Sequence, residues 1–435
     1  MKFYNRNNEL DLLESTRASA EVSSKMTVVT GRRRIGKTSL ILKSVAGKPF
    51  VYLFISRKAE NLLCEEFAEE IKSKLNLKVF GEIKSFGVLF EFLMQSSVNQ
   101  HFTLIIDEFQ ELYNINSSIF SHMQNIWDLY KNKTKMHLII SGSVYSLMVK
   151  IFENSKEPLF GRADERIYLK PFDSSVIKTI LNDYRKDFQN IDLLTFYIIS
   201  GGVAKYLELL ADKNSLDFDS IMNDIFRENS IWLNEGKNLL IEEFGKDYTI
   251  YFSILSLIAS SKTSRSEIES ILQKNIGGYL DKLEKDYNLI ISVKPIFAKI
   301  NSRTQKYFIS DNFLNFWFRF IFKNSSALEI NNFNYLRQII DRDFSTFSGR
   351  FLENWFKDKL ALTGLYSKIA SYWDKKGNEI DIVAINEMNK TALIAEVKIN
   401  KSKIDLNILK EKSKALAEML NDYNIEFVGY SIEDM

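Results

Sequence analysis

The sequence predicts an α/β protein built around a parallel sheet that helices cover on both faces. Three observations indicate this fold class. Short apolar runs alternate with helical segments between Thr27 and Ser146, and strands that are apolar at nearly every position are typical of parallel sheets buried on both sides. Residues 173–243 have helical periodicity throughout, and strands and helices alternate again after Gly349. We therefore expect a large α/β domain, a helical part and a second, smaller α/β domain.

The domain organisation follows from these changes of pattern. At 435 residues the chain is long enough for several domains, each with its own core. The expected segments are a first α/β domain at 1–172, a helical lid subdomain at 173–245, a winged-helix module at 246–322, a linker at 323–348 and a C-terminal α/β domain at 349–435.

The elements of the two α/β domains are predicted from apolar, β-branched and helical patterns. In the first domain the strands cover 27–30, 50–55, 104–106 and 137–140, and a helix at 38–45 follows the first strand. In the last domain the order is helix, three strands, helix and strand, at 350–360, 366–372, 379–385, 393–399, 406–420 and 426–430.

Three helical patterns and a hairpin predict the winged-helix module. The helical patterns lie around 251–258 and at 266–272 and 278–285, and the two strands of the hairpin lie at 289–293 and 306–309. The candidate recognition helix, 274–286, has three lysines and three acidic residues, whereas a helix that enters a DNA groove brings positive charge to the phosphates. An intramolecular docking module is the favoured interpretation, and Arg303 and Lys306 on the wing keep DNA reading as the alternative.

Composition and charge exclude several classes of protein. Fifty-eight lysine and arginine residues against 56 acidic ones leave a net charge of +2, so any nucleic acid must bind at a local patch. The single cysteine, Cys64, excludes an intrachain disulfide and a thiolate zinc site, and three histidines cannot form a histidine-rich metal centre. The most apolar stretch, 314–322, is too short to cross a membrane. We expect a cytoplasmic protein without membrane insertion.

A glycine-rich loop with a lysine and a threonine lies between the first predicted strand and the first predicted helix. Its residues are Gly31, Arg32, Arg33, Arg34, Ile35, Gly36, Lys37, Thr38 and Ser39. They match the P-loop pattern in the strand and helix context that this pattern requires. Backbone N–H groups of such a loop surround phosphates, the lysine reaches the β and γ phosphates, and the threonine hydroxyl binds Mg²⁺. The loop predicts an ATP and Mg²⁺ site with Lys37 as a catalytic residue and Thr38 as a metal ligand.

Two carboxylates end the third predicted strand. Asp107 and Glu108 follow its apolar residues about 70 positions after the P-loop. At this place an aspartate can hold Mg²⁺ and a glutamate can orient the attacking water. The next strand ends at Ser141-Gly-Ser143, where the Ser141 hydroxyl either contacts the γ-phosphate or caps the strand end.

With these motifs, the N-terminal two-thirds of the chain resembles archaeal-type P-loop ATPases of the AAA-related, signal-transducing (STAND) class. Phe3-Tyr-Asn-Arg6-Asn-Asn-Glu9 matches an element of that family, which implies that Arg6 helps to hold the adenine. Gly161-Arg162 matches another, which implies that Arg162 approaches the γ-phosphate in its own or a neighbouring subunit; a surface salt bridge is the alternative.

A third family element, Gly-Gly-x-Pro-x-Tyr-Leu, is similar to Gly201-Gly-Val-Ala204-Lys-Tyr206-Leu207. Here Ala204 stands in the place of proline, so the fixed φ of proline is lost at this position. This departure weakens the expectation that the helical subdomain moves with the nucleotide.

Acidic and basic side chains in the last domain are spaced for a second site. Asp381 lies on one predicted strand, Glu396 and Lys398 lie on the next, and Glu353 lies on the preceding helix. Residues two apart on a strand point to the same face, so Asp381, Glu396 and Lys398 can meet. Two carboxylates can hold Mg²⁺ or Mn²⁺ and a lysine can lower the pKa of an attacking water, as phosphodiester hydrolysis requires. A solvated Glu-x-Lys charge pair is the alternative.

This arrangement resembles the restriction-endonuclease-like, PD-(D/E)xK superfamily over about the last 90 residues. The resemblance implies that Asp381, Glu396 and Glu353 are metal ligands and that Lys398 is catalytic, with Ile380 in the place of the signature proline. A local basic patch that could meet a phosphate backbone consists of Lys401, Lys403, Lys410 and Lys412.

Taken together, the motifs predict an ATP-binding and ATP-hydrolysing switch coupled to a metal-dependent, nuclease-like domain that acts on DNA or another nucleic acid. Two alternatives stay open. In one, the C-terminal domain binds nucleic acid or a protein partner without cleaving; in the other, the chain is a plain ATPase with an inert C-terminal domain. A homo-oligomer is among the expected assemblies.

Overall fold

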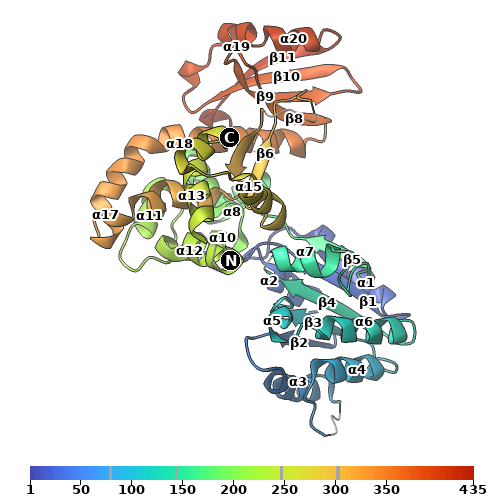
Figure 1. The fold of residues 1–435 in the computed structure, drawn as a ribbon. Helices are drawn as coiled ribbons and strands as arrows, with labels where there is room; N and C mark the ends of the chain where they lie inside the picture. The colour runs from blue at the N-terminus through green and yellow to red at the C-terminus, as the bar shows by residue number, and fades with distance from the viewer. Residues whose placement is uncertain (78–80, 144, 245–247, 300–303) are drawn as a thin grey trace. The chain divides into compact units, whose positions relative to one another are not determined.

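The computed structural model describes residues 1–435 except 78–80, 144, 245–247 and 300–303. The chain divides into two compact units (Figure 1). The first unit is Phe3–Lys170, and the second unit consists of Met1–Lys2 and Pro171–Met435. The finer division into five segments stays a prediction.

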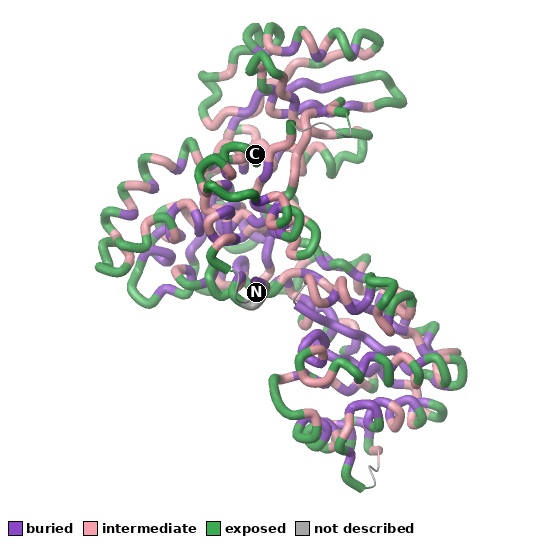
Figure 2. Tube along the Cα trace, viewed as in Figure 1, coloured by how far each residue is buried: buried purple, intermediate pink, exposed green. Residues whose placement is uncertain are grey.

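A five-stranded parallel sheet forms the centre of the first unit. Its order is β2-β3-β4-β1-β5. The strands are β1 (Lys25–Thr30), β2 (Phe50–Phe54), β3 (Phe102–Asp107), β4 (Met136–Gly142) and β5 (Glu165–Tyr168). Every residue of β3 and β4 is buried, as Figure 2 shows for the interior of this sheet. The predicted fold class, with a parallel sheet between helices, is confirmed.

Strand β5 is the one strand of this sheet that the sequence pattern does not predict. Along Glu165–Tyr168 only Ile167 is buried, because β5 is an edge strand that pairs with β1 alone. A strand with one buried residue has no apolar run, so the signal used for the other four strands is missing.

In the described residues of the first unit, seven α-helices flank the sheet. They are α1 (Asn7–Ser19), α2 (Lys37–Ser44), α3 (Glu60–Leu75), α4 (Phe86–Ser96), α5 (Glu111–Ile115), α6 (Ile119–Tyr130) and α7 (Tyr145–Glu153). Apolar side chains of α3, α4, α6 and α7 form one buried cluster with the strands. Helix α4 begins where the Ser85 side chain accepts a hydrogen bond from the Val88 N–H group, a common helix start.

The second unit begins with five α-helices in its described residues before position 245. They are α8 (Ser174–Tyr184), α9 (Asn190–Ser200), α10 (Ala204–Asp212), α11 (Phe218–Ile225) and α12 (Ile231–Phe244). Between α9 and α10, Gly202 has a φ of 72°, and a Cβ there would collide with the Phe172 carbonyl oxygen. This turn therefore requires glycine. Helix α10 begins at Ala204 without the proline of the related family element.

Three helices and a hairpin follow in the predicted order. They are α13 (Tyr248–Ala259), α14 (Arg265–Leu272), α15 (Gly277–Asp281) with a π-helical turn (Lys282–Asp286), and the antiparallel strands β6 (Ile290–Val293) and β7 (Lys306–Ile309). Shorter helical segments come next, at Asn312–Phe316 (α16), Trp317–Ile321, Phe322–Asn324 and Ser325–Glu329 (α17). Arg303, named as a wing residue in the sequence, lies outside the described residues.

Helix α18 is longer than the sequence pattern predicts. It runs over 30 residues, Phe333–Leu362, whereas the predicted helix covers only 350–360 and leaves most of the helix in the predicted linker. The buried side chains recur every fourth position along it, at Leu336, Ile340, Phe344, Ser348, Leu352 and Phe356. The stripe is interrupted in the sequence because a polar residue, Ser348, occupies one of its buried positions.

A four-stranded sheet closes the second unit. Its order is β11-β10-β9-β8, with β10 and β11 parallel and the other pairs antiparallel. The strands are β8 (Lys368–Trp373), β9 (Glu379–Asn386), β10 (Thr391–Lys398) and β11 (Asn424–Ser431). The helix predicted at 406–420 forms two helices, α19 (Leu406–Lys412) and α20 (Lys414–Met419), and single 3-10 turns lie at Lys401–Lys403 and Ile432–Asp434. Across the described part of the chain, no helix has the length and apolar character needed to span a bilayer.

Candidate nucleotide site and candidate metal site

The P-loop lies where β1 ends and α2 begins. Gly31 has a φ of 150° and Gly36 a φ of 99°. A Cβ at Gly31 would come within 2.7 Å of the Leu169 carbonyl oxygen, so this glycine lets the loop pass close to the strand next to it. Arg34 also has a positive φ, 65°. Of the three arginines, Arg33 and Arg34 are exposed.

The Lys37 side chain is folded into the loop. It is buried, and its Nζ donates hydrogen bonds to the carbonyl oxygens of Gly31 at 2.9 Å and Arg32 at 3.0 Å. The ammonium group is thus held inside the curve of the loop by backbone dipoles. A loop of this shape with an enclosed cation fits the phosphates of a nucleotide.

Thr38 and Asp107 meet across the sheet edge. The Thr38 hydroxyl donates to Asp107 Oδ2 at 2.9 Å, and the Glu108 N–H group donates to Oδ1 at 2.9 Å. The carboxyl ends of β1 and β3 meet here with β4 between them, because parallel strands bring their ends to one edge. Hydroxyl and carboxylate oxygens are the ligands that Mg²⁺ prefers, so the donor set fits this cation.

Ser143 rather than Ser141 reaches Glu108. The Ser143 hydroxyl donates to Glu108 Oε2 at 2.7 Å, and the Gln110 amide donates to the same oxygen. The Ser141 hydroxyl is buried and has no hydrogen-bond partner within the described residues. The sequence shows both serines, but only the register of β4, which ends at Gly142, reveals that Ser143 lies beyond the strand and is free to turn toward β3.

Arg162 lies at the edge of the sheet opposite the P-loop. Its guanidinium pairs with Asp128 at 2.9 Å. Two residues later, the Asp164 carboxylate accepts from the Met26 N–H group at the start of β1, whereas the P-loop follows the end of β1. The structure therefore does not bring Arg162 to Lys37 within this subunit, and the surface salt bridge is what it shows.

Arg6 is buried at the start of the first unit. Its guanidinium donates to the Lys170 carbonyl oxygen at 2.6 Å and pairs with Glu9 at 3.2 Å. These bonds tie the beginning of the first unit to its end. The structure thus gives Arg6 a structural role, and its predicted contact with adenine stays a prediction.

In the C-terminal sheet, Asp381, Glu396 and Lys398 meet as the sequence predicts. Lys398 Nζ lies 2.6 Å from Glu396 Oε1 and 3.5 Å from Asp381 Oδ2. Strands β9 and β10 are antiparallel with Ile382 opposite Ala395, so Asp381 and Glu396 are neighbours on one face. Burial is the largest influence and opposes the charge of Lys398, but the hydrogen bonds to Glu396 and Asp381 and the negative charges of these two acids together raise the pKa of Lys398.

Glu353 reaches this site from α18. Burial and the nearby charge of Asp381 raise the pKa of Glu353 to about 7, and burial also raises the pKa of Asp381. The Lys357 ammonium lies 3.6 Å from Glu353 Oε2 and donates to the Ser371 hydroxyl, which in turn donates to the backbone carbonyl oxygen of Asp381. Burial is thus the main cause of both raised pKa values, because Lys357, Lys398 and Lys412 supply three positive charges to the three acids Glu353, Asp381 and Glu396.

The carboxylates fit a divalent cation only in part. Glu396 Oε2 is buried and finds no hydrogen-bond partner in the described part of the chain, which suits an oxygen that binds a metal ion. Yet no group of three or more His, Cys, Asp or Glu side chains is arranged for a metal in the described residues. A site of two carboxylates completed by water and phosphate oxygens is the arrangement that Mg²⁺ commonly uses, and Asp381 with Glu396 fits it.

Comparisons with known proteins agree with the nucleotide site. Residues 3–210 match a family described as an ATPase domain predominantly from Archaea, and residues 317–415 match a family of archaeal and bacterial proteins of unknown function. The uncharacterized protein MJECL04 of Methanocaldococcus jannaschii is 31% identical over 407 residues, which cover 91% of this chain and 87% of the relative.

Two solved structures are also similar. The Walker-type ATPase paby2304 of Pyrococcus abyssi has a TM-score of 0.56 at 19% identity, over 73% of this chain and 96% of that chain. The ORC2 protein of Aeropyrum pernix, in ADPNP-ADP complexes, has a TM-score of 0.47 at 14% identity, over 76% of this chain and 96% of that chain. The predicted resemblance to archaeal-type ATPases is confirmed. The chain belongs to the same family as the Methanocaldococcus jannaschii protein, and its N-terminal part is a P-loop ATPase domain of the predominantly archaeal kind.

Proposed function

We propose that the chain is an ATP-controlled switch whose C-terminal domain hydrolyses phosphodiester bonds in DNA with a bound divalent cation. The observation that carries the proposal is the meeting of Asp381, Glu396 and Lys398 on adjacent strands. Glu396 Oε2, which is buried and has no hydrogen-bond partner in the part of the chain that the structure describes, supports it further. A buried oxygen without a partner costs free energy, so the packing of the sheet does not explain this oxygen.

Each residue of this site has a chemical role in the proposal. Asp381 and Glu396 would hold Mg²⁺ or Mn²⁺, with Glu353 as an accessory acid, and such a cation polarises a phosphate and lowers the pKa of bound water. Lys398 keeps its charge because its pKa is raised. Its ammonium group would stabilise the negative charge that develops on the phosphate.

Contacts inside the second unit support a coupling between the lid helices and this site. The Ser174 N–H group at the start of α8 donates to Asp358 Oδ2 at 2.7 Å, and Lys178 donates to the Met435 carbonyl oxygen at 2.8 Å. Helix α18 carries both Asp358 and Glu353. A displacement of α8 on nucleotide binding would therefore be transmitted to the helix that completes the C-terminal site.

A second candidate function is binding of nucleic acid without cleavage. Lys398 and Lys412 both pair with Glu396, and Lys401 pairs with Glu433 at 3.6 Å. In these ion pairs the lysines neutralise carboxylates that a cation would otherwise bind, and the carboxylates neutralise lysines that a phosphate would otherwise bind. The absence of a three-ligand metal group among the described residues also favours binding without cleavage.

The winged-helix region supports the docking interpretation over DNA reading. The Ile296 N–H group donates to the Ser371 carbonyl oxygen of β8 at 2.9 Å, and Lys306 on β7 pairs with Glu379 at 2.9 Å. Lys306 also lies 4.7 Å from the centre of the Trp373 ring. Lys306 is thus engaged within the chain instead of being presented to phosphates.

The test is incubation of the purified protein with plasmid and single-stranded DNA, with Mg²⁺ or Mn²⁺, and with or without ATP. Asp381→Ala should abolish cleavage, whereas Glu426→Gln, which alters an exposed carboxylate on β11, should retain it. Lys37→Ala should remove the response to ATP. Cleavage that survives in Asp381→Ala contradicts the proposal, and DNA binding without cleavage in every condition favours the second function.

A further inference from the structure

The Asp107 carboxylate has a partner that the P-loop pattern does not include. Its Oδ2 accepts a hydrogen bond from the Tyr52 hydroxyl at 2.7 Å, in addition to the one from Thr38. Asp107 is 4% exposed, so water cannot easily replace a lost donor. Tyr52 thus contributes one of three hydrogen bonds that hold this carboxylate.

The register of the sheet explains how Tyr52 reaches Asp107. Strands β2 and β3 are parallel, with Tyr52 opposite Ile105 and Phe54 opposite Asp107. Side chains two apart on a strand share a face and are about 6.6 Å apart along it. The long tyrosine side chain can bridge that rise and place its hydroxyl beside Asp107, whereas the directly opposite Phe54 has no polar group.

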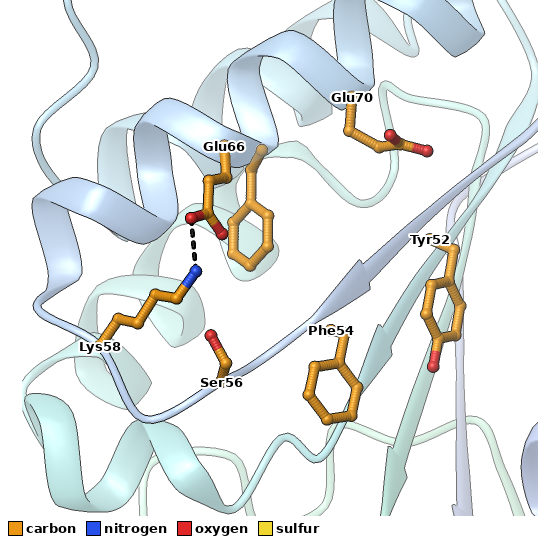
Figure 3. A pocket seen from close by; sticks show the side chains of 7 residues that line it. Tyr52, Phe54, Ser56, Lys58, Glu66 and Glu70 are labelled. Carbon is orange, nitrogen blue, oxygen red and sulfur yellow. Dashed lines mark hydrogen bonds and ion pairs between the residues drawn. The ribbon is translucent and has the colours of Figure 1, made fainter.

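Tyr52 stands at an open edge of the molecule. Strand β2 is the last strand on its side of the sheet, and Tyr52 and Phe54 line a pocket of about 460 Å³ with residues of α3 (Figure 3). Figure 3 shows both rings on the same side of β2. Within the described residues, the Tyr52 hydroxyl has its one hydrogen bond with Asp107.

The Tyr52 hydroxyl donates to a carboxylate, which can only accept when it is ionised. A phenylalanine would fill the same space, so packing alone does not explain the hydroxyl.

We propose that Tyr52 is a positioning residue for the Mg²⁺–nucleotide site. It holds the Asp107 carboxylate so that Oδ2 stays directed toward the Thr38 hydroxyl. Groups that orient a metal ligand in this way usually contribute a factor of about 10 to 100 to metal affinity. Tyr52 thereby extends the site from the P-loop to the edge strand. The inference rests on ATP binding by the P-loop domain and does not depend on cleavage at the C-terminal site.

The test measures binding of a fluorescent ATP analogue, so it requires no hydrolysis. Mg²⁺ is titrated at fixed analogue concentration into the wild type, Tyr52→Phe and Phe54→Leu. Mg²⁺ should increase the binding of the analogue, and we expect the Mg²⁺ concentration that gives half of this increase to rise about 10-fold in Tyr52→Phe. The affinity for the analogue without Mg²⁺ should be unchanged. Phe54→Leu alters the neighbouring ring in the same pocket but leaves Asp107 untouched, and should behave as the wild type.

A double variant separates positioning from strand stability. If Tyr52 acts through Asp107, adding Tyr52→Phe to Asp107→Asn should cause no further shift in the Mg²⁺ titration. In the Mg²⁺ titration, three results would overturn the inference: a midpoint within twofold of the wild type in Tyr52→Phe, an equal shift in Phe54→Leu, or an additive shift in the double variant. A loss of analogue binding without Mg²⁺ would also contradict it, because that result indicates a general structural role for β2.

Discussion

The Ser143 hydroxyl donates a hydrogen bond to Glu108 Oε2 over 2.7 Å, and Glu108 itself has a φ of 53°. Such a left-handed conformation costs a residue other than glycine on the order of 1 kcal/mol or more. The end of β4 therefore helps to hold the carboxylate that follows β3 in a strained position, next to the Asp107 carboxylate and the P-loop threonine.

The first prediction concerns Ser143, compared with Ser141 on the same segment. Ser143→Ala should lower kcat for ATP hydrolysis by about 10- to 100-fold with little change in ATP affinity, because a carboxylate that orients water contributes about 100-fold or more. Steady-state hydrolysis and nucleotide binding measure the two quantities. A larger loss in Ser141→Ala than in Ser143→Ala would instead favour a γ-phosphate contact by Ser141.

The second prediction concerns Arg162. Because it pairs with Asp128 at the far edge of the sheet, Arg162→Ala should leave the rate per subunit within about twofold at concentrations where the chain is monomeric. Hydrolysis rates across a range of protein concentrations provide the check, and sedimentation identifies the monomer. A large loss in the monomer would contradict this placement. A loss confined to an assembled state would show that Arg162 acts on a neighbouring subunit.

The third prediction is a pH dependence of stability. Burial lowers the pKa of His137 from 6.5 to about 3. Between these values the unfolded state binds a proton that the folded state does not, so the free energy of unfolding falls as pH falls, by up to about 1.4 kcal/mol per pH unit. In His137→Gln, chemical denaturation followed by circular dichroism should show a shallower decline. His122→Gln, which replaces an exposed histidine, is the control. If the free energy of unfolding falls equally steeply with pH in both variants, His137 is not the source of the pH dependence.

The fourth prediction concerns the contact between α18 and α8. Asp358→Ala removes the acceptor for the Ser174 N–H group and should lower the free energy of unfolding of the second unit by about 1 kcal/mol, as loss of a helix cap does. Limited proteolysis should then cut more rapidly near the start of α8. Asp173→Ala removes a local cap on the same helix and serves for comparison. If Asp173→Ala lowers the free energy of unfolding but Asp358→Ala does not, the contact with α18 does not stabilise α8.

Local motifs made much of the nucleotide site predictable. The P-loop, Asp107 and Glu108 have characteristic spacing because neighbouring backbone groups bind the phosphates. The C-terminal group was predictable for a similar reason, since Glu396 and Lys398 alternate on one strand. Tyr52 and Ser143 were not predictable, because their partners lie 55 and 35 residues away and only strand register joins them. For Arg162 the sequence left a γ-phosphate contact and a surface salt bridge open; the structure shows the salt bridge with Asp128 within this subunit, and a role toward a neighbouring subunit stays a prediction.

The sequence by itself determined the alternation of strands and helices, the P-loop with its two following carboxylates, and the residue types of the C-terminal site. These features depend on periodicity and short-range spacing, which the order of amino acids contains directly. Tertiary structure alone decided that Tyr52 holds Asp107, that Ser143 holds Glu108, that Arg6 is buried against Lys170, and that α18 extends to Phe333. Each of these depends on which distant segment supplies a hydrogen-bond acceptor or an apolar surface, and that choice is made only when the sheets assemble.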